Sequence, residues 1–254
     1  MERIRKPFQG VTNIIRFNWH FYVLAALLVG MIWIVNTALG TKFTAYATLL
    51  TGIIVLPIIV SLAVSIYVYD YSGLYTMPWL CGIKLQHGAT IINVHAGLDE
   101  FSVFLRLRFP EATLRVFDFY DNNKHTEVSI KRARNAYPPF PGTTSISSDT
   151  LPTAESSADL ILVALAAHEI RNEQERIRFF QELKRTIKPE GLIIVTEHLR
   201  DLPNFLAYSI GFFHFLSGIS WNHTFSNSQL QIRQKLKTTP FINSYILTKN
   251  GTAY

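Results

Sequence analysis

Histidines and carboxylates follow short apolar segments of this 254-residue chain, each at the point where its segment ends. They are His95 and Asp99, then Asp118, then His168 and Glu169, and finally Glu197 and His198. If the apolar segments are strands of one parallel sheet, their carboxyl ends meet at one edge, where the ligands of such sheets bind. Imidazole and carboxylate groups at that edge can exchange protons with a substrate or hold its polar atoms.

His168 is the side chain best suited to acid–base chemistry, because a neutral imidazole can accept a proton near pH 7. Glu169 is the next residue and is placed to orient a substrate that His168 deprotonates. We therefore predict that His168 and Glu169 are catalytic. The alternative is a structural histidine bonded to a loop carbonyl, beside a solvated carboxylate.

A glycine and an acid are spaced as in a nucleotide-binding site. Gly97 follows the first apolar segment and Asp118 ends the second, at the separation of about 20 residues that such sites show. The glycine lets a ligand approach the backbone, and the acid can accept hydrogen bonds from ribose hydroxyls. The loop lacks the Gly-x-Gly-x-x-Gly pattern of a dinucleotide site, which favours a cofactor without a phosphate.

The segments that must position these residues alternate between apolar strands and amphipathic helices from residue 91 onward, which is typical of an α/β fold. We expect parallel strands over 91–94, 114–117, 143–146, 160–165 and 192–196, and a closing antiparallel pair over 230–237 and 242–248. Helices are expected over 101–109 and 126–137, and along the stripe Ile177, Phe180, Leu183 and Ile187, followed by a turn at 188–191.

One stretch of the sequence carries a family pattern. Leu151-Pro152 precedes the run Ser157–Val163, and the run Glu182–Val195 contains Lys-Pro-Glu-Gly before an apolar segment. These runs resemble the fourth strand, the next helix, the Lys-Pro-Gly-Gly-type turn and the fifth strand of class I S-adenosylmethionine-dependent methyltransferases, of the type 11 or ubiquinone–menaquinone kind. The resemblance covers most of residues 91–249. It implies a Rossmann-like sheet with helices on both faces, and S-adenosylmethionine as cofactor.

The resemblance also implies cofactor contacts in the first two loops. Gly97 matches the middle glycine of the family's first motif, with His95 and Asp99 beside it. Asp118 matches the acid that binds the cofactor ribose. Two of the three motif glycines are replaced here, so the methionine end of the cofactor would be held differently, through Asp99 or Glu100.

The adenine contact falls on Ser147 or Asp149, where the register of the resemblance is open. The replaced glycines leave a second hypothesis, a catalytically inactive methyltransferase-like membrane interaction module. A nicotinamide-dependent oxidoreductase is disfavoured, because the chain has neither the glycines of a phosphate loop nor a Tyr-x-x-x-Lys pair near the fifth strand.

Two long apolar runs, Phe17–Thr41 and Phe43–Tyr69, precede this region and are separated only by Lys42. Each is long enough to cross the hydrocarbon core as a helix, and neither has the polar face of a helix in a soluble protein. A signal peptide would be one shorter run before a cleavage site. We predict a basic cytoplasmic segment at 1–16, a transmembrane helical hairpin at 17–70 and a methyltransferase-like domain at 71–254.

Charge predicts the orientation of this hairpin. Four basic residues precede the first run, namely Arg3, Arg5, Lys6 and Arg16. The positive-inside rule therefore places the N-terminus in the cytoplasm, and two crossings return the domain to the same side. The prediction is a multi-pass integral membrane protein with a cytoplasmic N-terminus and a cytoplasmic catalytic domain.

Composition limits the partners. A net charge of +6 suits attraction to anionic membrane lipid, and no arginine-rich run or basic-aromatic patch supports a nucleic-acid partner. Cys81 is the single cysteine, and neither it nor the spacing of His198, His214 and His223 predicts a metal site.

The uncharged aromatic run Phe205–Trp221 lies between the fifth strand and the closing pair, where related enzymes build the acceptor pocket. Packing in the core is the simplest account of such a run. Together with the hairpin, however, it favours a lipophilic acceptor. The predicted function is a membrane-anchored S-adenosylmethionine-dependent methyltransferase acting on a lipophilic small molecule such as a quinone, phenol or lipid.

Overall fold

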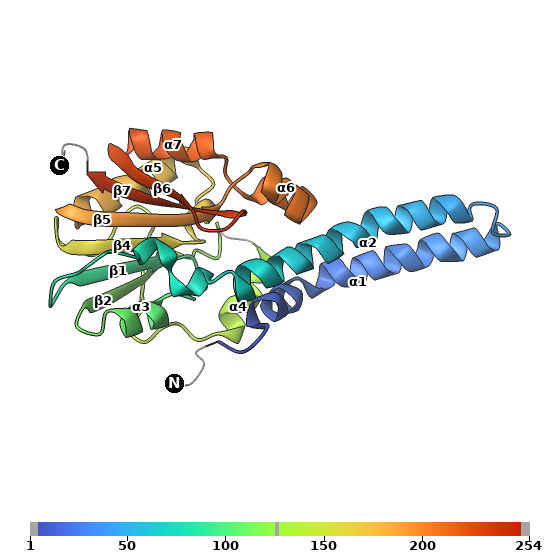
Figure 1. Ribbon diagram of the computed structural model, residues 1–254, viewed down its shortest axis with the longest axis horizontal. Helices are drawn as coiled ribbons and strands as arrows, with labels where there is room; N and C mark the ends of the chain where they lie inside the picture. Colours follow the sequence, from blue (N-terminus) through green and yellow to red (C-terminus); the bar gives the residue numbers. More distant parts are fainter. Residues whose placement is uncertain (1–4, 125–126, 250–254) are drawn as a thin grey trace.

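The computed structural model describes residues 5–124 and 127–249. These residues form a seven-stranded sheet with helices on both faces, and a helical hairpin that projects from one end of the sheet (Figure 1). In their order across the sheet the strands are β3 (Thr144–Ser145), β2 (Thr113–Asp118), β1 (Thr90–His95), β4 (Ala158–Ala164), β5 (Ile187–His198), β7 (Ile242–Lys249) and β6 (Leu230–Lys237). Strands β1 to β5 are parallel, and β7 is antiparallel to both of its neighbours. The predicted α/β sheet with its closing antiparallel pair is confirmed.

Five helices accompany this sheet in the described part of the chain. They are α3 (Ser102–Arg108), α4 (Val128–Ala136), α5 (Glu173–Thr186), α6 (Leu202–Tyr208) and α7 (Gly218–Asn227). Helices α4 and α6 lie at the end of the sheet from which the hairpin projects (Figure 1). The helix predicted over 126–137 is therefore present as α4, and its first predicted residue, Thr126, lies outside the described residues.

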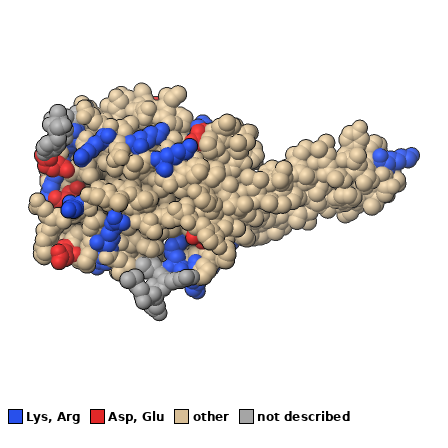
Figure 2. Space-filling view, in the orientation of Figure 1, with Lys and Arg blue, Asp and Glu red and all other residues tan. Residues whose placement is uncertain are grey.

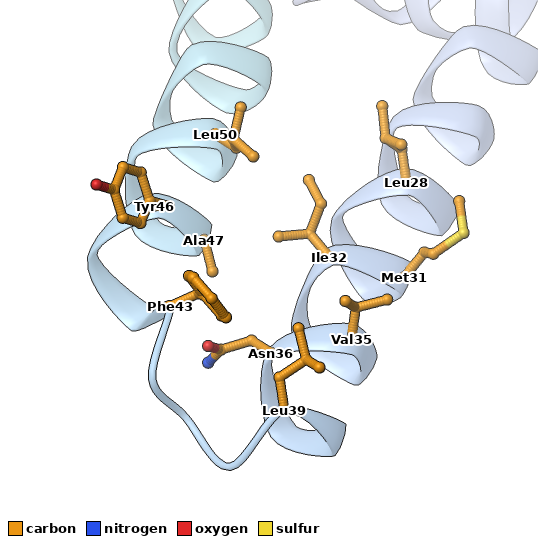
Figure 3. Close-up of a pocket in the computed structure, with 10 residues that line it drawn as sticks. All are labelled: Leu28, Met31, Ile32, Val35, Asn36, Leu39, Phe43, Tyr46, Ala47 and Leu50. Carbon is orange, nitrogen blue, oxygen red and sulfur yellow. The ribbon is translucent and has the colours of Figure 1, made fainter.

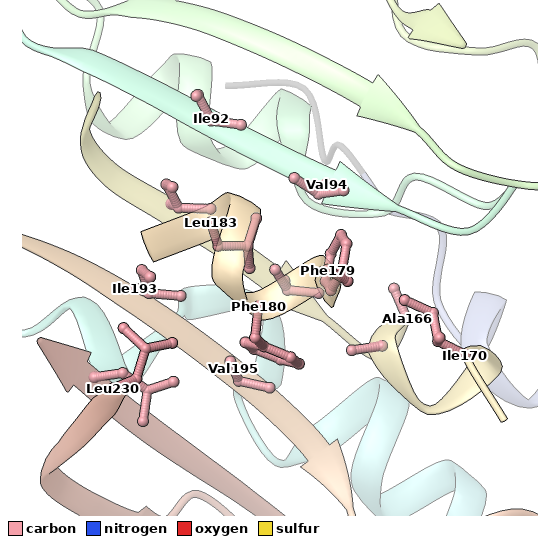
Figure 4. Close-up of a cluster of buried hydrophobic side chains, with 14 of the residues drawn as sticks. Ile92, Val94, Ala166, Ile170, Phe179, Phe180, Leu183, Ile193, Val195 and Leu230 are labelled. Carbon is pink, nitrogen blue, oxygen red and sulfur yellow. The ribbon is translucent and has the colours of Figure 1, made fainter. Parts of the chain in front are cut away.

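Each face of the sheet carries its own apolar layer. On one face Val94 and Val195 pack with Phe180 of α5 in a cluster of fully buried side chains (Figure 4). On the other face Ile91 packs with Leu105 of α3 and with the buried side chains of the segment 74–80, namely Leu74, Met77, Trp79 and Leu80. Neighbouring residues of β1 thus serve opposite layers, as the two-residue period of a strand requires. Because both faces are covered, the edge formed by the strand ends is where a ligand can reach the parallel strands.

The turn predicted at Lys188–Gly191 is wrong, because these residues lie inside β5. Ile187 already pairs with Ala158, and the register shifts before Leu192 pairs with Leu160. Such an irregularity accommodates Pro189, which has no N–H to donate to the ladder. A Cβ on Gly191 would lie 2.7 Å from the Ile187 side chain and 3.0 Å from the Ala158 carbonyl, so the glycine is needed for this close approach.

The hairpin consists of α1 (Gln9–Ala38) and α2 (Thr44–Ile66), and α2 continues into a π-helical turn at Tyr67–Tyr71. Helix α1 is kinked at Asn18, next to the residue where the long apolar run begins. Both helices are long and apolar enough to cross a membrane, and little of their surface is buried. Figure 2 shows the projecting hairpin without acidic or basic side chains except at its tip. The predicted helices are confirmed, while their crossing of a membrane stays a prediction.

The far half of the hairpin contains an apolar cavity between its two helices. Near its turn the two helices flank an apolar cavity of about 420 Å³, into which Ile32, Phe43 and Leu50 project (Figure 3). Two side-chain hydrogen bonds connect the helices beside it, from Trp33 to Thr51 and from Asn36 to Thr44. Asn36 and Ala47 are buried between the helices at this end, and the outward surface of both helices is almost wholly apolar.

The near end of the hairpin is tightly docked on the sheet domain. The Asp70 carboxylate accepts hydrogen bonds from the backbone N–H groups of Gly10 and Val11, at 2.8 and 3.0 Å, which joins the end of α2 to the start of α1. Helix α4 contacts α1 through Arg132, which donates to the Phe17 carbonyl at 2.6 Å. This end of the hairpin therefore has a defined position relative to the strand ends.

His198 completes the contact between the hairpin and the sheet. The amide nitrogen of Asn204 donates to Asp201 and to the Phe241 carbonyl, so its oxygen must accept from Nδ1–H of His198. His198 Nε2 is then left to accept from the Tyr69 hydroxyl at 2.9 Å. Burial lowers the pKa of His198 to about 4 and keeps the ring neutral.

This neutral ring predicts a loss of stability in acid. The folded-state pKa of His198 lies below the ordinary value of 6.5, so the unfolded chain takes up the proton first as the pH falls. The contribution is therefore present above pH 6.5 and is lost progressively as the pH falls toward 4. We expect the thermal unfolding midpoint of the solubilised protein to fall more steeply between about pH 7 and pH 5 than that of His198→Gln, which has no such proton to take up. Equal pH slopes for the two proteins would contradict this prediction.

Candidate functional site

The ends of the parallel strands and the base of the hairpin enclose a cavity of about 480 Å³, here called the interface cavity. The hairpin contributes apolar and aromatic side chains, among them Phe17, Tyr22 and Tyr69. The opposite wall includes His168 and Glu169, which follow β4. The two residues predicted to be catalytic therefore face a space that the hairpin helps to build.

His168 lies between two carboxylates. Its Nδ1 is 2.7 Å from Oε2 of Glu197, and its Nε2 is 3.3 Å from Oε1 of Glu169. Burial alone would lower the pKa of His168, but the Glu197 carboxylate and then Glu169 raise it to about 10. The two carboxylates thus favour the protonated imidazole, which argues against the predicted neutral base, and the catalytic roles of His168 and Glu169 stay predictions. The ring nitrogens of His168 lie against carboxylates and not against a loop carbonyl, so the structural alternative is not observed in its predicted form either.

Glu197 holds the loop that carries this pair. Its carboxylate is fully buried at the end of β5, and its Oε1 accepts from the backbone N–H groups of Ala166 and His168, at 3.1 and 3.3 Å. A buried carboxylate is tolerated when charge and hydrogen bonds compensate it, and the loop after β4 supplies both. The interactions that compensate the buried Glu197 carboxylate therefore fix the position of His168.

His214 joins this group from the segment between α6 and α7, and sequence spacing did not indicate it. Its Nε2 is 3.4 Å from Oε1 of Glu169, and its Nδ1 is 2.6 Å from Oε1 of Glu127. Burial alone would raise the pKa of Glu169, but hydrogen bonds with His168 and His214 hold it well below its usual range. Glu169 thus stays ionised between two imidazole rings.

The loop after β1 presents two polar atoms without partners. His95 Nδ1 accepts from the backbone N–H of Gly97 at 3.2 Å, which leaves Nε2 as the donor. That atom and Oδ2 of Asp99 are buried, and neither has a hydrogen-bond partner among residues 5–124 and 127–249. Burial lowers the pKa of His95, so the ring is neutral. A donor and an acceptor of this kind fit the polar groups of a small ligand. Glu100, in contrast, is engaged by Arg5 and Tyr75.

Arg134 of α4 lies across the groove where the resemblance places the cofactor. Its guanidinium pairs with Oδ2 of Asp118, while Oδ1 accepts from the backbone N–H of Tyr120 at 3.0 Å. A Cβ on Gly97, whose φ is +93°, would lie 3.1 Å from the Arg134 side chain and 3.2 Å from Ile130. Asp118 and Gly97 are therefore adjacent, as predicted, but the space above them is filled. The sequence did not single out Arg134.

A second cavity of about 420 Å³ lies beyond Asp118. Ser147 lines it together with Tyr120 and Asn122, which suits the predicted adenine contact. Asp149 does not line this cavity, and its carboxylate lies 3.6 Å from the exposed Arg178. The structure thus favours Ser147 over Asp149, and the cofactor roles of both residues stay predictions.

A family model described as "Methyltransferase domain" matches residues 120–195. Solved structures resemble a larger part of the chain in fold. Geranyl diphosphate C-methyltransferase from Streptomyces coelicolor is 10% identical with a TM-score of 0.51, and the match covers 70% of this chain and 79% of that one. An S-adenosylmethionine-dependent methyltransferase from Clostridium acetobutylicum is 10% identical with a TM-score of 0.50, over 70% of this chain and 91% of that one. Residues 120–195 thus match a methyltransferase domain, and the sheet and its helices have the Rossmann-like fold of methyltransferases.

A third structure, a methyltransferase from Aquifex aeolicus, is 14% identical with a TM-score of 0.49, and the match covers 70% of this chain and 93% of that one. The sequence matches no curated protein. The predicted family resemblance is confirmed for residues 120–195, where the type 11 description fits. The family match and the shared fold support S-adenosylmethionine-dependent methyl transfer, with S-adenosylmethionine as cofactor.

Arg134 generates a prediction about cofactor affinity. The guanidinium of Arg134 pairs with the Asp118 carboxylate and fills the space over Gly97, so it competes with a cofactor for both. We therefore expect Arg134→Ala to bind S-adenosylhomocysteine about tenfold more tightly, which corresponds to about 1.4 kcal/mol of binding free energy. Isothermal titration on the detergent-solubilised protein measures this change. Lys131→Ala, an exposed position on the same helix, is the matched control and should leave the affinity unchanged. Weaker binding by Arg134→Ala would show that the arginine holds the cofactor instead.

Proposed function

We propose that this chain is a membrane-anchored methyltransferase that transfers the methyl group of S-adenosylmethionine to a lipophilic small molecule. The observation that carries the proposal is the interface cavity, which is walled on one side by the apolar hairpin and on the other by the strand ends. An acceptor that enters this cavity contacts both the hairpin and the loops of the methyltransferase domain. Such a site suits a quinone, phenol or lipid whose apolar part comes from the bilayer.

The surface around the cavity supports a lipid environment. Beside the hairpin, α6 and the segment after it expose Leu206, Ile210 and Phe213, which are 66%, 81% and 61% exposed. Exposed apolar side chains in one region mark an interaction surface. Together with the hairpin they form a continuous apolar flank that would rest in the membrane interface. The aromatic run from Phe205 to Trp221 is thus divided, since Trp221 is fully buried in the core.

The residues at the strand ends divide into two roles. His95, Asp99, Asp118 and Ser147 would hold the cofactor, whose sulfonium supplies the methyl group. The unpartnered atoms of His95 and Asp99 would bond polar groups at one end of the cofactor, and Ser147, which lines the cavity beyond Asp118, would contact the other end. His168 and Glu169 would orient the acceptor in the interface cavity rather than remove its proton as a neutral base.

The alternative is a methyltransferase-like membrane interaction module without activity. Arg134 over Gly97 is the observation that favours it, because the groove is filled by the chain's own side chains. The two hypotheses differ in one measurable property, which is the binding of S-adenosylmethionine.

We expect the solubilised protein to bind S-adenosylmethionine and Asp118→Asn to lose most of that binding, because the carboxylate would accept from the ribose hydroxyls. Asp149→Asn is the matched control and should bind normally, since Asp149 lies outside the second cavity. Isotope-labelled S-adenosylmethionine should then label a membrane lipid extract rather than the water-soluble fraction of the same cells.

No binding by a folded sample would select the inactive alternative. Labelling confined to water-soluble molecules would instead retain the methyltransferase and reject the lipophilic acceptor.

Membrane anchoring is tested separately. Leu27 and Ile53 lie on the exposed surface of the hairpin, and an aspartate at the centre of a spanning helix costs about 2.5–3.5 kcal/mol. We expect Leu27→Asp with Ile53→Asp to release protein from membranes into alkaline carbonate, whereas Leu107→Asp with Ile219→Asp, equally exposed on the domain, should not. A C-terminal tag should be protected from protease in intact cells. Release of the unaltered protein by carbonate, or cleavage of the tag from outside, would contradict the anchoring or its orientation.

A further inference from the structure

Three side chains at the strand ends bring metal-ligating atoms together. One ligand atom each from His168, Glu169 and His214 lies within 4.8 Å of the other two. Oε1 of Glu169 is 3.3 Å from Nε2 of His168 and 3.4 Å from Nε2 of His214. Ligands about 2.0–2.1 Å from a tetrahedral ion are about 3.3 Å apart, so these spacings already suit a common ion.

Each of the two histidines is oriented by a second carboxylate on its far side. Glu197 lies 2.7 Å from Nδ1 of His168, and Glu127 lies 2.6 Å from Nδ1 of His214. A carboxylate that accepts from Nδ1–H orients the ring so that Nε2 is the nitrogen that a metal ion binds, in place of the proton held there, and this pairing is common among metal-binding histidines. Both rings thus direct the same nitrogen toward Glu169.

The three groups also have the exposure and composition of an open site. The side chains of His168 and Glu169 are 12% and 7% exposed and that of His214 is 26% exposed, and all three line the interface cavity. Two imidazoles and one carboxylate leave coordination positions for water or a substrate, as in metal sites that bind substrate directly. The cavity supplies the space for such a molecule.

We propose that His168, Glu169 and His214 bind a divalent transition-metal ion, whose open positions face the interface cavity. Imidazole-rich sites select Zn²⁺ and the neighbouring transition metals over Mg²⁺ and Ca²⁺. If the proposed function holds, the ion coordinates a hydroxyl or carbonyl oxygen of the lipophilic acceptor and fixes the position of that oxygen. The binding of the metal itself does not depend on the methyl-transfer reaction.

Arg171 is the one competing cation beside the three ligands within the described chain. Its guanidinium contacts both ring nitrogens of His214, with a short contact to Nδ1 and a distance of 3.2 Å to Nε2, and it also bonds the carbonyl of that residue. The Arg171 side chain is 43% exposed, so it can turn toward solvent when an ion takes its place. Its removal should therefore tighten metal binding, which a purely structural ion-pair network would not show.

The test is a titration of Co²⁺ into the full-length, detergent-solubilised protein, purified without a histidine tag and stripped with a chelator. We expect one equivalent to bind, with the visible absorption of a four- or five-coordinate site and displacement by Zn²⁺. His214→Ala and Glu169→Gln should weaken binding at least tenfold, and Glu197→Gln should weaken it by about 10–100-fold through the orientation of His168. Arg171→Gln should tighten it.

His223→Ala is the matched control, because His223 pairs with Glu173 at 2.8 Å outside the cluster and is exposed. It should bind Co²⁺ as the unaltered protein does, and thermal unfolding of each variant shows whether it is folded. Absence of binding, or equal binding by folded His214→Ala and Glu169→Gln, would overturn the proposal. Titration with S-adenosylmethionine is done on the same samples, so loss of metal binding and loss of cofactor binding are separate results.

Discussion

The candidate site depends on one buried carboxylate. Glu197 lies at the end of β5 with no exposed surface, and a charge in that position is stable only if the surrounding chain compensates it. The loop after β4 does so with two backbone N–H groups and with the ring of His168. The loop conformation, the side of the ring that faces the cavity and the position of Glu169 all follow from that requirement. Removal of the Glu197 charge would therefore affect a whole loop, and not a single contact.

The hairpin contributes to the candidate site as well as to the proposed membrane attachment. It forms one wall of the interface cavity, and it is held there by polar contacts at its base, from Asp70 to the start of α1 and from Tyr69 to His198. The rest of the hairpin has few such contacts and an apolar surface. The base therefore behaves as part of the domain, whereas the far half depends on whatever surrounds it.

Much of the fold could be predicted from the sequence, because its signals are local. The strands at β1, β2, β4 and β5, and the residues that end them, follow from short apolar runs. The prediction of a turn at Lys188–Gly191 failed because a proline and a glycine also fit an irregular strand. Only the pairing of Ile187 with Ala158 distinguishes a strand from a turn here. The preference for a protonated His168 could not be predicted, because the charges around it come from separate loops.

Two members of the site could not be found by spacing. His214 meets Glu169 only when the segment after α6 folds back toward the strand ends, and Arg134 reaches Asp118 only through the position of α4. In each case the partners are distant in sequence, and no periodicity of either segment reveals the contact. The sequence of these segments indicated only an aromatic run and a helix over 126–137, because neither pattern carries information about tertiary contacts.

The bond between Arg132 and the Phe17 carbonyl has a consequence for how this contact would change in evolution. A main-chain acceptor exists whatever residue occupies position 17, so α1 can exchange one apolar side chain for another without losing that bond. The arginine has no such freedom, because its reach and its donor geometry make the contact. Among related sequences, the arginine at position 132 would thus be retained while the residue at position 17 varies. Correlated substitutions between the two helices would not reveal this contact.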